Sequence, residues 1–123
     1  MFCDWEELRQ TLARLARQPT CRRNEWSTKM PCDWAPMQVE TKLGLFFSDA
    51  GAWELIAELL ESGHPFQEVT LRVPRGDVAY ETTVRLRTDL PVIYIKVQLK
   101  AGRIWGRSFH NALRSTVGGE KHE

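Results

Sequence analysis

The sequence predicts an α+β domain in which two N-terminal helices pack on a C-terminal antiparallel sheet of about four strands. Three observations support this prediction. Apolar residues recur with helical spacing in two segments before residue 63. After residue 68 the spacing changes to the alternation that is typical of strands. Short turn sequences separate the alternating segments, which favours a meander of neighbouring strands.

The first predicted helix covers residues 5–17. Asp4 and Glu7 have the spacing of a capping box, in which each side chain binds a free backbone N–H at the start of a helix. The apolar residues then fall on one stripe and give the helix a buried face: Trp5, Leu8, Leu12 and Leu15. Proline cannot continue a helix, so this one is expected to end before Pro19.

The segment 18–42 has no period and contains three prolines, two tryptophans and two cysteines. Such a composition indicates a long irregular connection held by the burial of its aromatic side chains. It is typical of functional loops and of segments that wrap around a domain, and we favour the wrap.

The second predicted helix covers residues 49–62, with Ser48 as its N-cap and Gly63 as its end signal. Its buried stripe is Trp53, Ile56, Ala57 and Leu60. Four strands are predicted to follow, over residues 69–73, 79–86, 92–99 and 103–110.

A chain of 123 residues is long enough for one core and too short for two, so we predict a single domain. Its parts are a helix with an irregular N-terminal extension (1–42), a helix with an antiparallel sheet (43–115) and a flexible tail (116–123). No apolar run reaches the roughly 18–20 residues that span a bilayer, and the first residues are acidic. We therefore expect a cytoplasmic protein with no membrane segment.

The three cysteines are Cys3, Cys21 and Cys32, and their odd number argues against a disulfide framework. A zinc site needs a fourth ligand and closer cysteine pairs. We therefore predict no metal site and no cofactor.

Charge is unevenly distributed along the chain, although the net charge is only +1. Residues 1–69 carry seven basic and eleven acidic side chains, whereas residues 70–115 carry nine basic and three acidic ones. A C-terminal part with a net charge near +6 suggests a surface for a polyanion or an acidic protein. The alternative is that these cations protect strand edges from aggregation.

Alternation in the third predicted strand separates a core row from a polar row. Ile93, Ile95, Val97 and Leu99 form the core row, and Tyr94, Lys96 and Gln98 point the other way.

For the connection Lys100-Ala101-Gly102 we predict a three-residue turn with a bulge, because Ala101 disfavours the positive φ of a two-residue turn. This register places Ser108 and His110 on the polar face and directs Trp105, Arg107 and Phe109 toward the core. A slip of one residue would reverse every assignment, so the sequence leaves the direction of Arg107 open.

The polar face contains the groups needed for RNA cleavage without a metal. We take His110, Tyr94, Lys96 and the neighbouring Glu81 as catalytic candidates. A base removes the proton of the ribose 2′-hydroxyl, cations stabilise the charge that develops on phosphate, and an acid protonates the leaving 5′ oxygen. The alternative is that His110, Tyr94 and Lys96 are ordinary solvated residues of an exposed face.

Residues 93–110, IYIKVQLKAGRIWGRSFH, resemble the C-terminal hairpin of the MqsR group of bacterial toxins. The pattern in that group is roughly V-Y-L-K, a short turn and an apolar strand ending in S-F-K. LGLFF (43–47), followed by a helix, resembles the group's Leu-Gly-Leu-x-Phe segment. The resemblance covers residues 43–110. It implies a RelE-like fold and an mRNA interferase that needs no metal and is inhibited by an antitoxin encoded beside it.

The resemblance implies roles for particular residues. Tyr94 matches the family's active-site tyrosine, and Glu81 falls near a catalytic glutamine. His110 stands where the family has a lysine, but other RelE-like enzymes end this strand with an aromatic residue and a histidine. An upstream catalytic lysine has no clear counterpart; Gln67 and Glu68 lie closest in sequence, and Arg72 is a possible substitute for its charge.

We therefore predict a metal-independent endoribonuclease, the toxin of a bacterial toxin–antitoxin pair. Its expected partners are mRNA, free or on the ribosome, and a cognate antitoxin, with no DNA contact except through that antitoxin. The candidate substrate-binding residues are Arg107, Arg85, Lys100, Arg72 and Trp105, the last as a stacking platform for an unpaired base. The alternatives are a non-catalytic RNA- or protein-binding module and an antitoxin or immunity protein.

Overall fold

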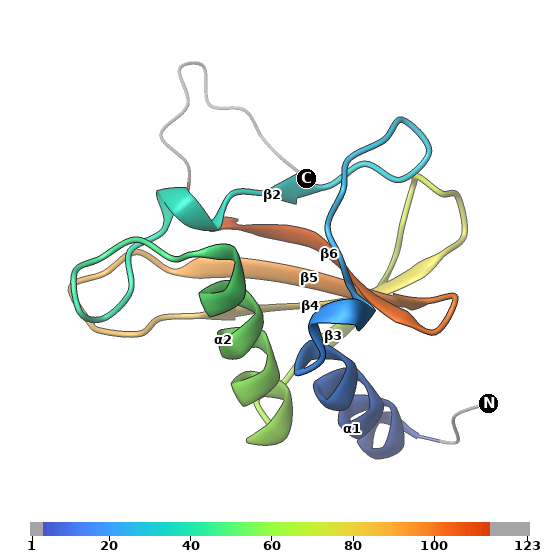
Figure 1. Cartoon of the computed structure of the whole chain (residues 1–123), viewed down its shortest axis with the longest axis horizontal. Helices are drawn as coiled ribbons and strands as arrows, with labels where there is room; N and C mark the ends of the chain where they lie inside the picture. Colours follow the sequence, from blue (N-terminus) through green and yellow to red (C-terminus); the bar gives the residue numbers. More distant parts are fainter. Residues whose placement is uncertain (1–3, 114–123) are drawn as a thin grey trace.

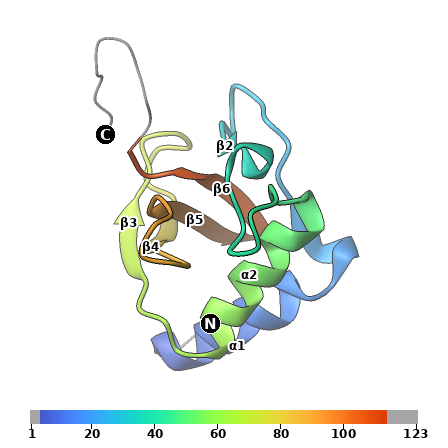
Figure 2. The same ribbon diagram turned by 90° about the vertical axis from the view of Figure 1, so that its left-hand side faces the viewer.

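The structure, a computed structural model, describes residues 4–113 and has two helices on one side of a six-stranded sheet (Figure 1). Figure 2 shows the same layering from the side. The α+β class, the two helices and the mainly antiparallel sheet are confirmed. The predicted number of strands is wrong, because the segment 18–42 adds two short ones. The predicted tail (116–123) lies outside the described residues.

Both helices begin at the predicted caps. Helix α1 covers Trp5–Ala16, and the Asp4 carboxylate accepts a 3.0 Å hydrogen bond from the Glu7 N–H. Helix α2 covers Asp49–Glu61, and the Ser48 hydroxyl accepts one of 2.9 Å from the Gly51 N–H. These bonds satisfy donors that have no partner within the helix, so local sequence alone defines where each helix starts.

Four strands form the predicted antiparallel meander: β3 (Gln67–Thr70), β4 (Val78–Val84), β5 (Ile93–Lys100) and β6 (Arg103–Asn111). The two extra strands are β1 (Arg22–Arg23) and β2 (Asp33–Trp34), and both pair in parallel with β6. The sheet order is β1-β6-β5-β4-β3, with β2 also on β6. Single-turn 3₁₀ helices cover Pro19–Cys21 and Pro36–Gln38.

Trp34 attaches the N-terminal segment to the core. Its ring lies 4.9 Å from the ring of Trp53 and 5.5 Å from that of Phe109, measured between centroids. The indole N–H donates a 2.7 Å hydrogen bond to the Asp49 carboxylate. Aromatic burial therefore holds this segment as predicted, although the second tryptophan, Trp26, is 62% exposed.

The core lies between the helices and the sheet. The apolar row of β5 is buried at Ile93, Ile95 and Val97, and Leu99 packs against it. From the helices, Leu12 and Trp53 are completely buried. The predicted apolar faces therefore meet, which leaves the other face of the sheet for polar side chains. Within residues 4–113, no helix is long and apolar enough to cross a bilayer.

The β5–β6 connection differs from the prediction. Lys100 pairs directly with Arg103, and Ala101 and Gly102 form a two-residue turn with φ angles of 54° and 73°. The predicted three-residue turn is therefore wrong. Two positive φ values match the type I′ geometry, whose twist suits a hairpin, so the gain in pairing outweighs the strain at Ala101.

A bulge farther along β6 returns the side chains at the end of the strand to the sheet faces predicted for them. Val97 lies opposite Gly106 and Lys96 lies opposite Ser108, which leaves Arg107 as the extra residue. Ser108 and His110 therefore share a face with Lys96 and Tyr94, as expected. Before the bulge the side chains of β6 point to the face opposite to the predicted one. Trp105 therefore lies opposite Gln98 on the polar face and is half-buried there. The prediction of Trp105 in the core is wrong.

We expect Ala101→Asn to raise the free energy of unfolding by about 0.5–1 kcal/mol, because asparagine tolerates positive φ and favours this turn. Urea unfolding measures the change. As a control, Gly102→Ala, which places a Cβ at a φ of 73°, should lower stability. Equal losses in both variants would contradict this account of the turn.

Candidate active site

The four catalytic candidates meet on the sheet face opposite the helices. Strand register brings them together: Tyr94 lies opposite His110, and Lys96 lies opposite Glu81. All four side chains are partly buried. Neighbouring strands hold them, so no loop has to close before they meet.

Tyr94 is at the centre of the group. Its hydroxyl donates a 2.5 Å hydrogen bond to Glu81 Oε1, and its ring centroid lies 5.3 Å from that of His110. The Lys96 ammonium lies 5.9 Å from the centroid of the Tyr94 ring. An imidazole, a phenol, a carboxylate and an ammonium group therefore occupy one patch.

The environment of Tyr94 keeps its phenol protonated. Burial raises the pKa of Tyr94, and the hydrogen bond to Glu81 and the negative charge of Glu81 raise it further. At neutral pH the phenol is therefore a hydrogen-bond donor and orients the Glu81 carboxylate.

The contacts of His110 define which ring nitrogen is available for proton transfer. Nδ1 lies 2.8 Å from the Asn111 carbonyl oxygen, which only accepts hydrogen bonds, so Nδ1 carries a proton. Nε2 is then the nitrogen that gains or loses a proton. It lies 3.6 Å from Asp33 Oδ2, so a protonated ring gains an ion pair. Asp33 comes from β2 and was missed in the sequence, where nothing indicates that this short strand reaches β6.

Arg107 points to the same face, which decides a direction that the sequence left open. Its side chain is 4% exposed, and Nη2 donates a 2.9 Å hydrogen bond to the Val73 carbonyl. It forms no ion pair within residues 4–113, and its buried Nε has no hydrogen-bond partner there. Burial lowers the pKa of Arg107, while the nearby Cys32 and Asp77 raise it.

Lys96 is the second cation of the patch. Its pKa is lowered mainly by burial; the charge of Glu81 opposes this shift, and the charge of Arg107 adds to it. A partly buried Lys96 beside a buried Arg107, without full compensation of their charges, favours the binding of an anion.

The other predicted substrate-binding residues make their contacts with other groups. The Arg85 guanidinium binds the Thr88 carbonyl at 3.0 Å, and the Lys100 ammonium pairs with Asp77 at 2.6 Å. Arg72 is exposed after β3, and the Trp105 indole donates to the Lys100 carbonyl. None of these four shares a hydrogen bond, ion pair or ring contact with Tyr94, Lys96, Glu81 or His110.

A shallow hollow of about 310 Å³ adjoins the patch beside Glu81. His64 and Gln67 line it together with Thr83. The hollow offers space for part of a substrate next to the carboxylate. His64 belongs to the connection after α2, which the sequence analysis did not connect with the site.

Within the described chain, no group of three or more His, Cys, Asp or Glu side chains is placed to hold a metal ion. Cys21 and Cys32 are free thiols, and Cys3 lies outside the described residues.

No protein-family model, curated protein or solved structure matches this chain. The resemblance to the MqsR group therefore stays a prediction.

The raised pKa values of both tyrosines of the chain predict a delayed alkaline titration. Burial also raises the pKa of Tyr80, with a contribution from Glu68. Each folded pKa lies above the unfolded value of about 10, so stability is lost as pH rises beyond about 10. Tyrosinate absorbance should thus appear later in the folded protein than after unfolding. Tyr80→Phe isolates Tyr94, and titration of that variant at the ordinary pKa would contradict the Tyr94–Glu81 bond.

Proposed function

We propose that this protein is a metal-independent endoribonuclease of the RelE-like kind and the toxin of a bacterial toxin–antitoxin pair. The observation that carries the proposal is the convergence of His110, Tyr94, Lys96 and Glu81 on one face of the sheet. Acid–base groups beside cations are the combination that cleavage at a ribose 2′-hydroxyl requires.

Proton transfer in the proposed reaction follows from the contacts of the two acid–base groups. Glu81, the acceptor of the Tyr94 hydroxyl, removes the proton of the 2′-hydroxyl as its oxygen attacks phosphorus. His110 in its protonated form, stabilised by Asp33, gives a proton to the departing 5′ oxygen. The products are a 2′,3′-cyclic phosphate and a 5′-hydroxyl.

The cations supply the electrostatic part of the proposed reaction. Lys96 lies beside the Tyr94 ring, and Arg107 lies close enough to influence the pKa of Lys96. Lys96 is partly buried and Arg107 is almost completely buried, so their attraction for the negative charge on phosphate oxygens is stronger than in water.

The proposed substrate is single-stranded RNA, free or on the ribosome. A duplex holds its 2′-hydroxyl and phosphate groups in a fixed helical geometry, whereas an unpaired strand can turn its backbone into the patch. The proposed partner protein is an antitoxin, and any contact with DNA is made through it.

The test incubates the purified full-length protein with end-labelled single-stranded RNA in EDTA. We expect cleavage to products with cyclic phosphate ends. A matched strand with one 2′-deoxynucleotide should resist cleavage at that position, because the attacking hydroxyl is missing. Binding of RNA without cleavage would contradict the enzyme and favour a binding module.

A further inference from the structure

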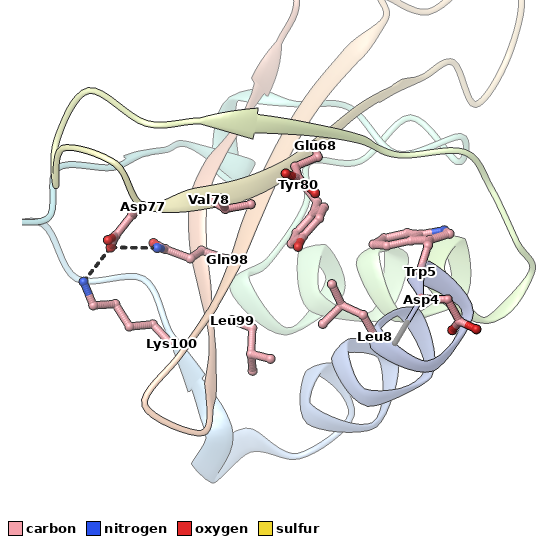
Figure 3. A pocket seen from close by; sticks show the side chains of 10 residues that line it. All are labelled: Asp4, Trp5, Leu8, Glu68, Asp77, Val78, Tyr80, Gln98, Leu99 and Lys100. Carbon is pink, nitrogen blue, oxygen red and sulfur yellow. Dashed lines mark hydrogen bonds and ion pairs between the residues drawn. The ribbon is translucent and has the colours of Figure 1, made fainter. Parts of the chain in front are cut away.

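A second cavity lies where the start of α1 meets the ends of β4 and β5. It is a groove of about 550 Å³, within the usual size of small-ligand sites (Figure 3). None of the four catalytic candidates lines it.

The groove exists because two neighbouring strands diverge. Pairing between β4 and β5 ends at Tyr80 and Val97, although β4 begins at Val78 and β5 continues to Lys100. The N-terminal end of α1 lies along the opening, as Figure 3 shows. The opening is therefore built from regular elements of the fold.

One side of the groove is apolar and aromatic. Trp5 and Leu8 come from α1, and Val78, Tyr80 and Leu99 come from the strands. The rings of Trp5 and Tyr80 lie 5.2 Å apart and are tilted by 36°. Aromatic faces are electron-rich, so this wall suits an aliphatic chain that ends in a cation.

The polar side of the groove is acidic. Three carboxylates line it, from Asp4, Glu68 and Asp77, against one cation, Lys100, which pairs with Asp77. Asp4 and Glu68 form no ion pair within residues 4–113. Glu68 lies opposite Tyr80 in the pairing of β3 with β4, which places this carboxylate beside the aromatic wall. The lining has a net charge of −2, so it favours a positive ligand.

The side chain of Gln98 gives a second, independent reason to expect a ligand in the groove. Its side chain is 2% exposed and lines the groove, and its amide nitrogen donates a 3.0 Å hydrogen bond to Asp77. The amide oxygen has no partner among the described residues. A buried acceptor without a donor is costly, and a ligand that carries several N–H groups satisfies it together with a carboxylate.

We propose that this groove binds an organic cation with N–H donors, a guanidinium or ammonium group on an aliphatic chain. The chain packs against Leu8 and Leu99, and the charged group lies beside the aromatic rings with its N–H groups toward Glu68 and the Gln98 amide oxygen. Such a group occurs in small amines and guanidines and in the basic side chains of peptides. The proposal does not depend on ribonuclease activity.

The test compares butylguanidine with butylurea, which has nearly the same shape and no charge, by titration calorimetry on the full-length protein. We expect butylguanidine to bind at least about tenfold more tightly, because hydrogen bonds to charged groups are stronger than neutral ones. Equal binding of the two compounds, or no binding of either, would overturn the proposal.

Single substitutions test whether butylguanidine binds in the groove. Glu68→Gln keeps the shape of the side chain and should weaken butylguanidine binding about tenfold. Glu58→Gln, which removes another exposed charge, from α2 and outside the groove, should leave binding unchanged. Trp5→Leu should also weaken binding, and thermal unfolding shows whether that variant folds. Equal effects of Glu68→Gln and Glu58→Gln would exclude the groove.

The source of the cation is distinguished with a short peptide, Gly-Arg-Gly. If the peptide binds more tightly than butylguanidine and Glu68→Gln removes this difference in affinity, the groove binds a basic side chain of a protein. If butylguanidine binds at least as tightly, the ligand is a free small molecule. The groove's preference for a guanidinium group is supported in both cases.

Discussion

His110→Ala should lower the rate of RNA cleavage by about 100-fold to 10,000-fold, the usual contribution of a well-placed acid or base. The same variant should no longer inhibit growth when it is expressed. The expected cause is the loss of the proton for the 5′ oxygen, since Nε2 is the ring nitrogen that exchanges a proton. The measurement is the single-turnover cleavage rate of the variant beside that of the natural protein under the same conditions.

The fold of this variant should be unchanged. His110 is only partly buried, and its hydrogen bond is to the carbonyl of the next residue, so little packing is lost. Gln10→Ala, on the exposed surface of α1 in the other layer, is the matched control and should keep full activity. Unchanged toxicity of His110→Ala, with a normal melting temperature, would count against His110 as the acid.

Gly106→Ala should lower the free energy of unfolding by about 1–3 kcal/mol, the usual cost of overpacking a core. A Cβ at this position would lie 2.6 Å from Cε3 of Trp34 and still closer to Cζ3. The indole cannot move away easily, because it packs against Trp53 and Phe109 and binds the Asp49 carboxylate. Chemical denaturation measures the change.

A double-mutant cycle shows whether Trp34 is the cause. In a Trp34→Leu background the smaller side chain leaves room for the Cβ, so Gly106→Ala should cost less than in the natural chain. Equal costs in both backgrounds would contradict the close packing of β2 on β6. Because Asp33 precedes Trp34, Gly106→Ala should also weaken the contact between Asp33 and His110 and reduce cleavage.

Local patterns were enough to predict most elements. Asp4 and Ser48 predict where the two helices begin, because an N-cap depends only on residues within one turn. The alternation of β5 separates Ile95 from Tyr94 and Lys96 whatever lies beside the strand.

The last hairpin shows where local patterns fail. The turn was predicted one residue too long, and the bulge at Arg107 was absent from the predicted register. The bulge returns the later side chains of β6 to their predicted faces, so Ser108 and His110 were placed correctly. Trp105 was placed wrongly, and the direction of Arg107 had been left open. Strand parity follows the number of unpaired residues, and two offsetting errors leave the end of the strand unchanged.

By itself the sequence determined the two helices, the antiparallel meander and the polar row that holds Tyr94, Lys96 and His110, because caps and alternation act over a few residues. Only the tertiary structure decided that β1 and β2 join the edge of β6, that Asp33 reaches His110 and that Arg107 lies on the polar face. These features depend on contacts between segments far apart in the chain. Two-residue strands carry no period from which such contacts can be predicted.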